Sequence, residues 1–191
     1  MNAQDIISFY KKNYGSHPLV IFSPGRLNLI GEHTDYNEGF VFPAAIDKGI
    51  YAAFAKSGSQ ACTIHALDLN ETMEFSLEQI NPLDGGGWKN YILGVVSEIQ
   101  NRTKRMLPFN LVFGGNVPLG AGLSSSAALE NAVAYGLNEL LDLGFTKNEM
   151  ILISQKAEHN FVGVKCGIMD QFASMFGEKD KALLLDCRTI T

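Results

Sequence analysis

The sequence is poor in cysteine and has no long apolar stretch. It contains three cysteines, Cys62, Cys166 and Cys187, and no two of them form a C-x-x-C pair. An odd number of unpaired cysteines is typical of a reduced, intracellular protein. No segment reaches about 18 consecutive apolar residues, and the N-terminal segment has no apolar stretch followed by a cleavage site. We therefore expect a cytoplasmic protein without a membrane span or a signal peptide.

The sequence also lacks an excess of positive charge and the histidine spacing of a zinc site. Lys and Arg total 15 against 20 Asp and Glu, which gives a net charge of -5. This balance, without a basic stripe, argues against nucleic acid or an anionic membrane as a partner. The 4 histidines form no H-x-x-x-H pair, which argues against zinc.

Hydrophobic periodicity in the 191 residues predicts an α+β fold, with helices packed on a mostly antiparallel or mixed sheet. There is no internal repeat, low-complexity tract or clear linker. Strands are expected at residues 19–22, 40–42, 50–55, 72–77, 109–113 and 182–185. Helices are expected around residues 6–10, at 88–100 and 124–141, and from a capping box at Thr146–Glu149 to Gly163.

The strongest local signal is GGNVPLGAGLSSSAA, residues 114–128. Glycine lets the backbone approach an anion closely, and the start of the following helix supplies unpaired N–H groups and a partial positive charge. The three serine hydroxyls add donors and a candidate Mg²⁺ ligand, so the pattern predicts a polyphosphate-binding loop. It is neither a Walker A loop nor a dinucleotide fingerprint. The alternative is a glycine-rich turn with a serine N-cap.

A second signal is GEHTDYN, residues 31–37, which follows a Gly-Arg pair. The mixture of carboxylates and an imidazole in Glu32, His33 and Asp35 suits the neighbouring hydroxyls of a sugar. The alternative is a solvated loop capped by Asp35 or Asn37.

A third signal combines Glu158-His159 on a helix with CGIMDQ, residues 166–171. Asp170 is either an N-cap for a short helix over residues 171–176 or a catalytic carboxylate. Glu158 lies in mid-helix, where an exposed carboxylate is normal, and its neighbourhood makes it a Mg²⁺ candidate. We interpret Cys166 as a small packing residue.

Together the three segments resemble the galactokinase family. PGRLNLIGEHTDYN (residues 24–37) is similar to the galactokinase signature, and CGIMDQ is similar to the segment that carries the catalytic aspartate. VPLGAGLSSSA (residues 117–127) alone resembles only the wider GHMP kinase superfamily, which includes homoserine, mevalonate and phosphomevalonate kinases. The three segments occur in the family's order and spacing, and the resemblance covers essentially the whole chain.

The resemblance implies the N-terminal lobe of a two-lobed GHMP kinase, similar to domain 2 of ribosomal protein S5. Residues 1–191 would form the sugar- and ATP-phosphate-binding domain, and the C-terminal GHMP domain would lie outside this chain. The isolated lobe would then be inactive or nearly so, and the missing lobe would cover an apolar face.

The implied reaction is the phosphorylation of the anomeric hydroxyl of α-D-galactose by ATP, which gives galactose 1-phosphate and ADP, the first phosphorylation step of galactose catabolism. The implied sugar-binding residues are Glu32, His33, Asp35, Gly167 and Asp170. Asp170 would accept or orient the anomeric hydroxyl, and Arg26 would lie near it and the transferring phosphoryl group.

The same resemblance implies an ATP site and a metal site. The implied ATP-binding residues are Gly120, Ala121, Gly122, Leu123, Ser124, Ser125, Ser126 and Trp88, the last of which is otherwise a core aromatic of an amphipathic helix. Ser126 and Glu158 are the implied Mg²⁺ ligands, since Mg²⁺ takes few protein oxygens besides phosphates and water.

Two other functions share these motifs. One is a related sugar-1-kinase acting on N-acetylgalactosamine or arabinose. The other is a non-catalytic galactose and ATP sensor, in whose known examples the Ser-Ala pair of the phosphate loop is missing. Here Ser126-Ala127 and Asp170 are intact.

Overall fold

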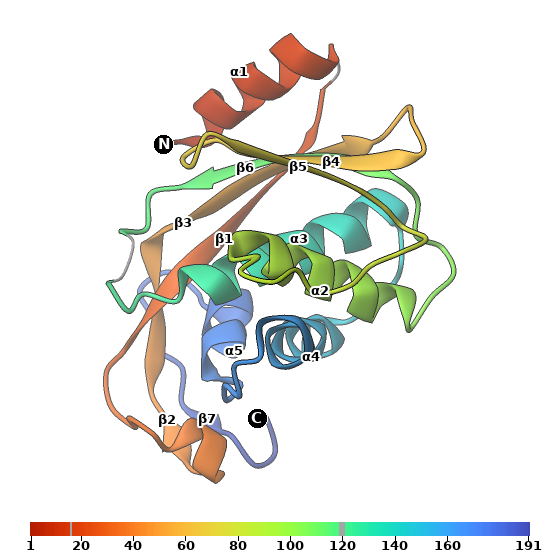
Figure 1. Cartoon of the computed structure of the whole chain (residues 1–191). Helices are drawn as coiled ribbons and strands as arrows, with labels where there is room; N and C mark the ends of the chain where they lie inside the picture. The colour runs from red at the N-terminus through yellow and green to blue at the C-terminus, as the bar shows by residue number, and fades with distance from the viewer. Residues whose placement is uncertain (16, 119–120) are drawn as a thin grey trace.

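The computed structural model describes residues 1–15, 17–118 and 121–191. A five-stranded sheet forms its centre, and a two-stranded sheet lies at the far end of the long strands (Figure 1). The elements are α1 (Ala3–Tyr14), β1 (Leu19–Asn28), η1 (Asp35–Asn37), β2 (Phe40–Val41), β3 (Pro43–Lys56), β4 (Ala61–Ala66), β5 (Glu71–Ser76), α2 (Trp88–Gln100), β6 (Phe109–Gly115), α3 (Ser125–Leu141), α4 (Lys147–Ala157), η2 (Glu158–Val162), α5 (Met169–Phe176) and β7 (Leu185–Asp186).

The main sheet is mixed, as expected, and has the order β1-β3-β6-β4-β5. Only β4 and β6 pair in parallel among the described strands, and the other neighbours are antiparallel. Helices α2 to α5 cover one face, while α1 crosses the other (Figure 1). The sheet is therefore buried on both faces in its middle.

The central strand β3 shows how both faces are filled. Because successive side chains of a strand point to opposite faces, Phe54 joins the core under α2, α3 and α4, whereas Ala53 joins the smaller core under α1. Ile6 and Tyr10, both fully buried, fix α1 onto that second face. The alternation matches the two-sided burial of a central strand.

Most of the expected elements are confirmed, including the capping box in which Thr146 and Glu149 exchange hydrogen bonds at the start of α4. Helix α4 continues into the π-helical turn η2, which ends at Gly163 in the left-handed region (φ 81°), as expected. Strands β1 and β3 extend well beyond their apolar runs.

One strand was missed and one strand expectation was wrong. Strand β4 was not expected, because its buried residues Cys62 and Ala66 are too small to give a strong apolar signal. The expected buried strand over residues 182–185 is reduced to β7, which pairs with β2, and Leu184 is 68% exposed. The apolar run is split there because only Leu185 faces the core beneath β2.

None of the helices in the described part of the chain combines the length and apolar character needed to cross a membrane.

Candidate active site

The glycine–serine loop before α3 is attached directly to strand β1. The Arg26 N–H donates to the Leu123 carbonyl oxygen at 3.1 Å, next to a register shift in β1 between Pro24 and Arg26. A Cβ atom at Gly25 would lie 2.5 Å from the same carbonyl oxygen. Gly25 therefore permits the close approach of β1 and the loop that brings Arg26 to the site.

Replacing Gly25 by Ala is expected to destabilise the chain by about 1–3 kcal/mol, the usual cost of forcing an atom into a packed site. The backbone of the loop must shift to admit the methyl group, since the obstructing atom is a main-chain oxygen. Urea unfolding of the 191-residue chain measures the change. Gly58→Ala is the matched control, because a Cβ there meets nothing within 4 Å. Equal stability of the two variants would show that the contact is unimportant.

Asp170 lies between a guanidinium and a hydroxyl. Arg26 donates to Asp170 Oδ1 through Nε at 2.8 Å and through Nη2 at 2.7 Å, and its Nη1 donates to the Gly122 carbonyl oxygen at 2.7 Å. The Ser124 hydroxyl donates to Asp170 Oδ2. A carboxylate has about four lone-pair positions, so Oδ2 retains room for one more donor, such as a substrate hydroxyl. Asp170 is 28% exposed and faces the loop pocket.

The capping interpretation of Asp170 was wrong, and that of Ser124 holds for its position but not for its side chain. Helix α5 begins at Met169, so Asp170 lies in its first turn, and Ile168 is the N-cap. Ser124 does precede α3, but its side chain makes no capping hydrogen bond. Its φ of 54° places it in the left-handed region, which is costly for a residue other than glycine, and its hydroxyl contacts Asp170 instead.

The loop lines a pocket of about 280 Å³ whose wall also contains Arg26 and Asp170. The loop residues that line it are Pro118, Ala121, Gly122, Leu123, Ser124, Ser125 and Ser126. Gly120 lies outside the described residues. The N–H groups at the start of α3 and the Arg26 guanidinium give this pocket the polarity that a phosphate group requires.

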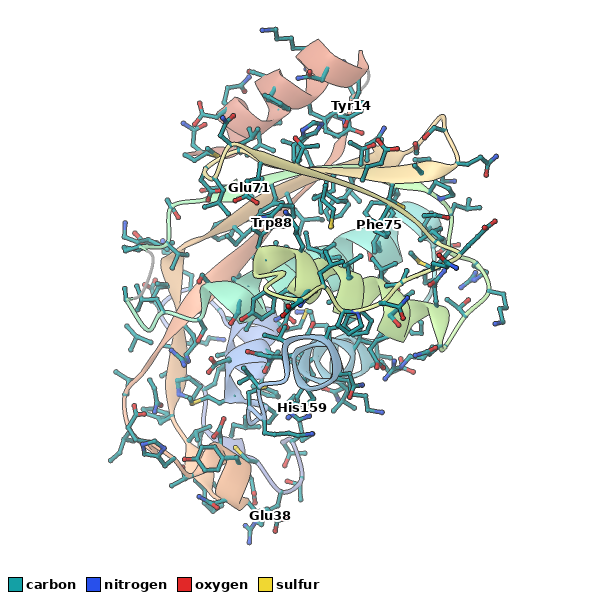
Figure 2. All side chains as sticks on the ribbon, in the orientation of Figure 1. Tyr14, Glu38, Glu71, Phe75, Trp88 and His159 are labelled. Carbon is teal, nitrogen blue, oxygen red and sulfur yellow. The ribbon has the colours of Figure 1, made fainter. Side chains whose placement is uncertain are left out.

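A second pocket of about 310 Å³ shares Ser125 and Ser126 with the first and is more apolar. Trp88 lines it and packs edge-on against Phe113 at 5.3 Å between ring centroids, so the core-aromatic interpretation is confirmed, while its assignment to the ATP site stays a prediction. Its Nε1–H donates to Glu71 Oε2 at 2.9 Å, and Figure 2 shows the two residues side by side. A flat apolar group joined to phosphates would fit across the two pockets.

The sugar-loop residue Asp35 lies beside the Arg26–Asp170 pair. Burial raises the pKa of Asp35, the N–H groups of Tyr36 and Met169 lower it, and the charges of Asp170 and Arg26 act on it in opposite directions. A Cβ atom at Gly167 would overlap the Asp35 carboxylate. The structure thus brings Asp35, Gly167 and Asp170 together, which contradicts the solvated-loop interpretation for Asp35.

Glu32 and His33 are exposed, and their hydrogen bonds are local. Glu32 Oε1 accepts from Asn28 Nδ2 at 2.9 Å, and His33 Nδ1 is hydrogen-bonded to the Tyr36 hydroxyl. In the described part of the chain neither side chain hydrogen-bonds to Asp170. Their assignment to the sugar site stays a prediction.

Glu158 is not the exposed mid-helix carboxylate that the sequence indicated. Its exposed fraction is 7%, and Oε2 accepts from Gln171 Nε2 at 3.0 Å and from Cys166 Sγ at 3.3 Å. Burial raises the pKa of Glu158, as does the charge of Asp170, while hydrogen bonds from Cys166 and Gln171 and the charge of His159 lower it. Cys166 is therefore a hydrogen-bond donor as well as a packing residue.

The surroundings of Ser126 and Glu158 suit a divalent cation. Both lie near the Tyr91 phenol: burial raises its pKa, the charges of Glu158 and Glu130 raise it further, and a hydrogen bond with Ser126 lowers it. Glu158 therefore lies close to a serine hydroxyl, and no Lys or Arg side chain is hydrogen-bonded to it in the described part of the chain. Among the described residues no group of three His, Cys, Asp or Glu could hold a metal by itself, so phosphate oxygens and water would complete the coordination of Mg²⁺.

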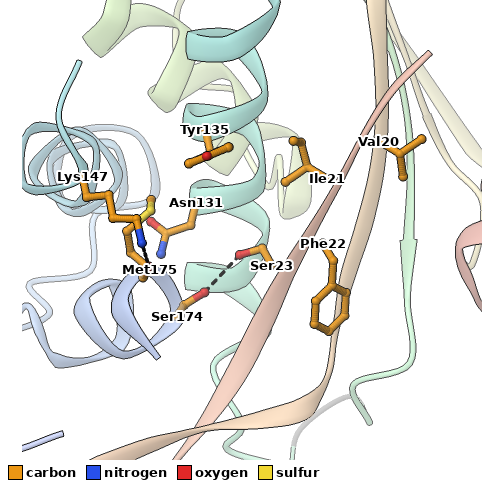
Figure 3. Close-up of a pocket in the computed structure, with 9 residues that line it drawn as sticks. All are labelled: Val20, Ile21, Phe22, Ser23, Asn131, Tyr135, Lys147, Ser174 and Met175. Atoms are coloured by element: carbon orange, nitrogen blue, oxygen red, sulfur yellow. Dashed lines mark hydrogen bonds between the residues drawn. The ribbon is translucent and has the colours of Figure 1, made fainter. Parts of the chain in front are cut away.

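Three residues near the site were not predicted. Glu130 and Gln171 are completely buried and hydrogen-bonded to each other, and Tyr91 interacts with both Ser126 and Glu158. An acid in the apolar run of α3 was the only available signal for Glu130. A separate pocket, shown in Figure 3, opens between β1, α3 and α5, and none of the expected site residues lines it.

Two family models match the chain. The galactokinase galactose-binding signature matches residues 8–56, and the GHMP kinases N terminal domain matches residues 90–178. A galactokinase of Roseiflexus sp. is 47% identical over 183 residues, which is 95% of this chain and 46% of that protein. The chain belongs to the galactokinase family. A galactokinase of Haemophilus influenzae is 45% identical over 99% of this chain and 49% of its own length.

The fold agrees with the family assignment. The crystal structure of Lactococcus lactis galactokinase complexed with galactose has a TM-score of 0.92 at 36% identity, and the match covers 98% of this chain and 50% of that one. A mevalonate kinase of Methanococcus jannaschii matches with a TM-score of 0.77 at 19% identity, which shows a shared fold. The chain spans about half the length of the galactokinases it matches.

Proposed function

We propose that residues 1–191 form the N-terminal GHMP kinase domain of a galactokinase, which transfers the γ-phosphoryl group of ATP to the anomeric hydroxyl of α-D-galactose. The observation that carries this proposal is Asp170, held by Arg26 and Ser124 in the wall of a pocket formed by the glycine–serine loop. The family membership supports it. Related acceptors such as N-acetylgalactosamine or arabinose are outcomes of the substrate test.

The acceptor sugar would lie against Asp170, Asp35 and Gly167. Glycine at 167 leaves the Asp35 carboxylate room to lie at the start of α5, and Asp35 can hold sugar hydroxyls while Oδ2 of Asp170 accepts from the anomeric hydroxyl. Glu32 and His33 would complete the sugar site from the exposed loop.

The nucleotide would lie across the two neighbouring pockets, which share Ser125 and Ser126. Its phosphates would accept hydrogen bonds from the N–H groups of the loop, and its base would lie near Trp88. Ser126 and Glu158 would hold Mg²⁺, which neutralises phosphate charge when bound.

The transfer forms a bond between phosphorus and the anomeric oxygen and breaks the bond to the β-phosphate, so ADP leaves. The proton of the anomeric hydroxyl passes towards Asp170 Oδ2, and the same hydrogen bond serves either proton acceptance or orientation. Arg26 stabilises the oxygens of the transferred group, since phosphoryl transfer depends mainly on positioning and charge neutralisation. A cytoplasmic location stays a prediction.

A coupled ADP-release assay with galactose, ATP and Mg²⁺ tests this proposal. It compares the 191-residue chain with the same chain followed by the C-terminal half that its relatives possess, called the extended protein below. We expect turnover in the extended protein and little or none in the 191-residue chain, because the relatives are about twice as long and the candidate pockets are open.

The outcomes of this assay are distinct. Turnover by the 191-residue chain alone would mean that one lobe suffices. ATP and galactose binding without turnover in the extended protein would support a sensor and overturn the kinase proposal. Faster turnover of N-acetylgalactosamine or arabinose would keep the kinase and change its substrate.

A further inference from the structure

Two adjacent polar residues of helix α3 are buried in the protein interior. Glu130 is completely buried and Asn131 is 2% exposed, although both lie in an otherwise apolar stretch of the helix. Burying an acid and an amide is costly unless hydrogen bonds compensate for the lost water. Their contacts therefore indicate what the two residues do.

Both residues contact residue 171, the neighbour of Asp170. Asn131 Nδ2 donates to the Gln171 main-chain oxygen at 2.8 Å, and Gln171 Nε2 donates to Glu130 Oε2 at 3.2 Å. Figure 3 shows the Asn131 side chain between α3 and α5. Main chain and side chain of Gln171 are thus each held by one of two successive residues of α3, and the first turn of α5 is fixed at two points.

The side chain of Gln171 also reaches the candidate metal ligand. Its Nε2 donates to Glu158 Oε2 at 3.0 Å as well as to Glu130. An amide nitrogen carries two hydrogens, so one is available for each carboxylate. The acceptor on Glu130 fixes the orientation of the amide, and the amide fixes Glu158.

A purely structural cluster accounts poorly for this arrangement. Three buried oxygens have no hydrogen-bond partner among the described residues: Glu130 Oε1, Asn131 Oδ1 and Gln171 Oε1. Unsatisfied buried groups are a cost to stability, and apolar side chains of similar volume would avoid it. The hydrogen bonds to residue 171 therefore point to a positioning role beside any structural one.

We propose that Glu130 and Asn131 are positioning residues that act through Gln171: Asn131 sets the position of Asp170, and Glu130 sets the orientation of Glu158. This inference deepens the proposed kinase function and rests on it. Neither residue touches the reacting atoms. Their removal should change catalysis and metal binding separately, which a merely structural role would not do.

The first test uses the extended protein. Asn131→Leu is expected to lower kcat by about 10-fold or more with little change in the KM for ATP. Glu130→Leu is expected to lower the affinity for Mg²⁺ by about 10- to 100-fold, the usual effect of losing a residue that supports a metal ligand. Calorimetric titration with Mg²⁺ and a non-hydrolysable ATP analogue measures the Mg²⁺ affinity without turnover. Glu130→Gln keeps an acceptor for Gln171 and should bind Mg²⁺ as tightly as the wild type.

The matched control is Asn138→Leu. Asn138 is buried on the same helix two turns later, and it accepts from the Phe145 N–H at 2.8 Å rather than contacting residue 171. This variant should lose stability and keep its kcat and Mg²⁺ dependence. Unchanged kcat in Asn131→Leu and unchanged Mg²⁺ binding in Glu130→Leu, in an active extended protein, would overturn the proposal.

A second measurement separates the positioning proposal from the kinase proposal. Amide hydrogen exchange of α5 in the 191-residue chain needs no substrate and no metal. Asn131→Leu should raise exchange in α5 by about tenfold, the effect of losing one buried hydrogen bond, whereas Asn138→Leu should not. If the extended protein shows no turnover, the kinase proposal fails. Unchanged exchange would show that Asn131 does not hold α5, and this would overturn the positioning role whatever the activity.

Discussion

Replacing Asp170 by Asn lowers the kcat of the extended protein by about 10²- to 10⁴-fold, the range expected when a positioned acid–base group is lost. Asn retains an oxygen that can accept from Arg26, but its amide nitrogen cannot accept from the Ser124 hydroxyl or from a sugar hydroxyl. The variant keeps the shape of the side chain and removes the acceptor from Oδ2. The KM for ATP should change little, because the phosphate-binding loop is untouched.

The coupled ADP-release assay measures this effect, and thermal unfolding checks that the variant is folded. The unfolding temperature should change little, since a partly exposed ion pair such as Arg26–Asp170 contributes only about 0–1 kcal/mol. Asp180→Asn is the matched control, because Asp180 is exposed and its φ of 61° is tolerated by Asn. A kcat of Asp170→Asn equal to that of the control would remove Asp170 from the mechanism.

Replacing Arg26 by Met lowers kcat by about 10²- to 10³-fold, which is the usual effect of losing one donor to charge that develops in a transition state. The planar guanidinium of Arg26 donates hydrogen bonds to both the Asp170 carboxylate and the Gly122 carbonyl oxygen. Its removal therefore leaves both the carboxylate and the loop without their common partner. Arg26→Lys should be intermediate, because Lys keeps the charge and loses the two-pronged geometry.

Arg188→Met is the matched control for this series. Arg188 also pairs with an aspartate, Asp186, at 2.6 Å, but it lies on the exposed chain after β7. Its loss should leave kcat unchanged. If Arg26→Met raised the KM for ATP and left kcat intact, Arg26 would bind the ground state and would not stabilise the transition state.

The local elements of the chain follow from the sequence where their signals are strong. The amphipathic pattern of residues 88–100 and the capping box at Thr146 each predicted a helix that the structure confirms. The hidden strand β4 shows the limit of this reasoning, since small side chains bury well and give little hydrophobic signal. Propensity and periodicity are properties of a short window, so they predict elements and not their neighbours.

The candidate site shows the same division. The sequence by itself determined the chemistry available: a glycine–serine loop before a helix, an Arg after a glycine, and an Asp beside a Gln. Only the tertiary structure decided that Arg26 meets Asp170 across 144 residues, that Asp35 lies against Gly167, and that Glu158 is buried. Those contacts depend on how α3 and α5 pack against β1 and on the space that Gly25 and Gly167 leave, and such long-range packing is not encoded in any local pattern of residues.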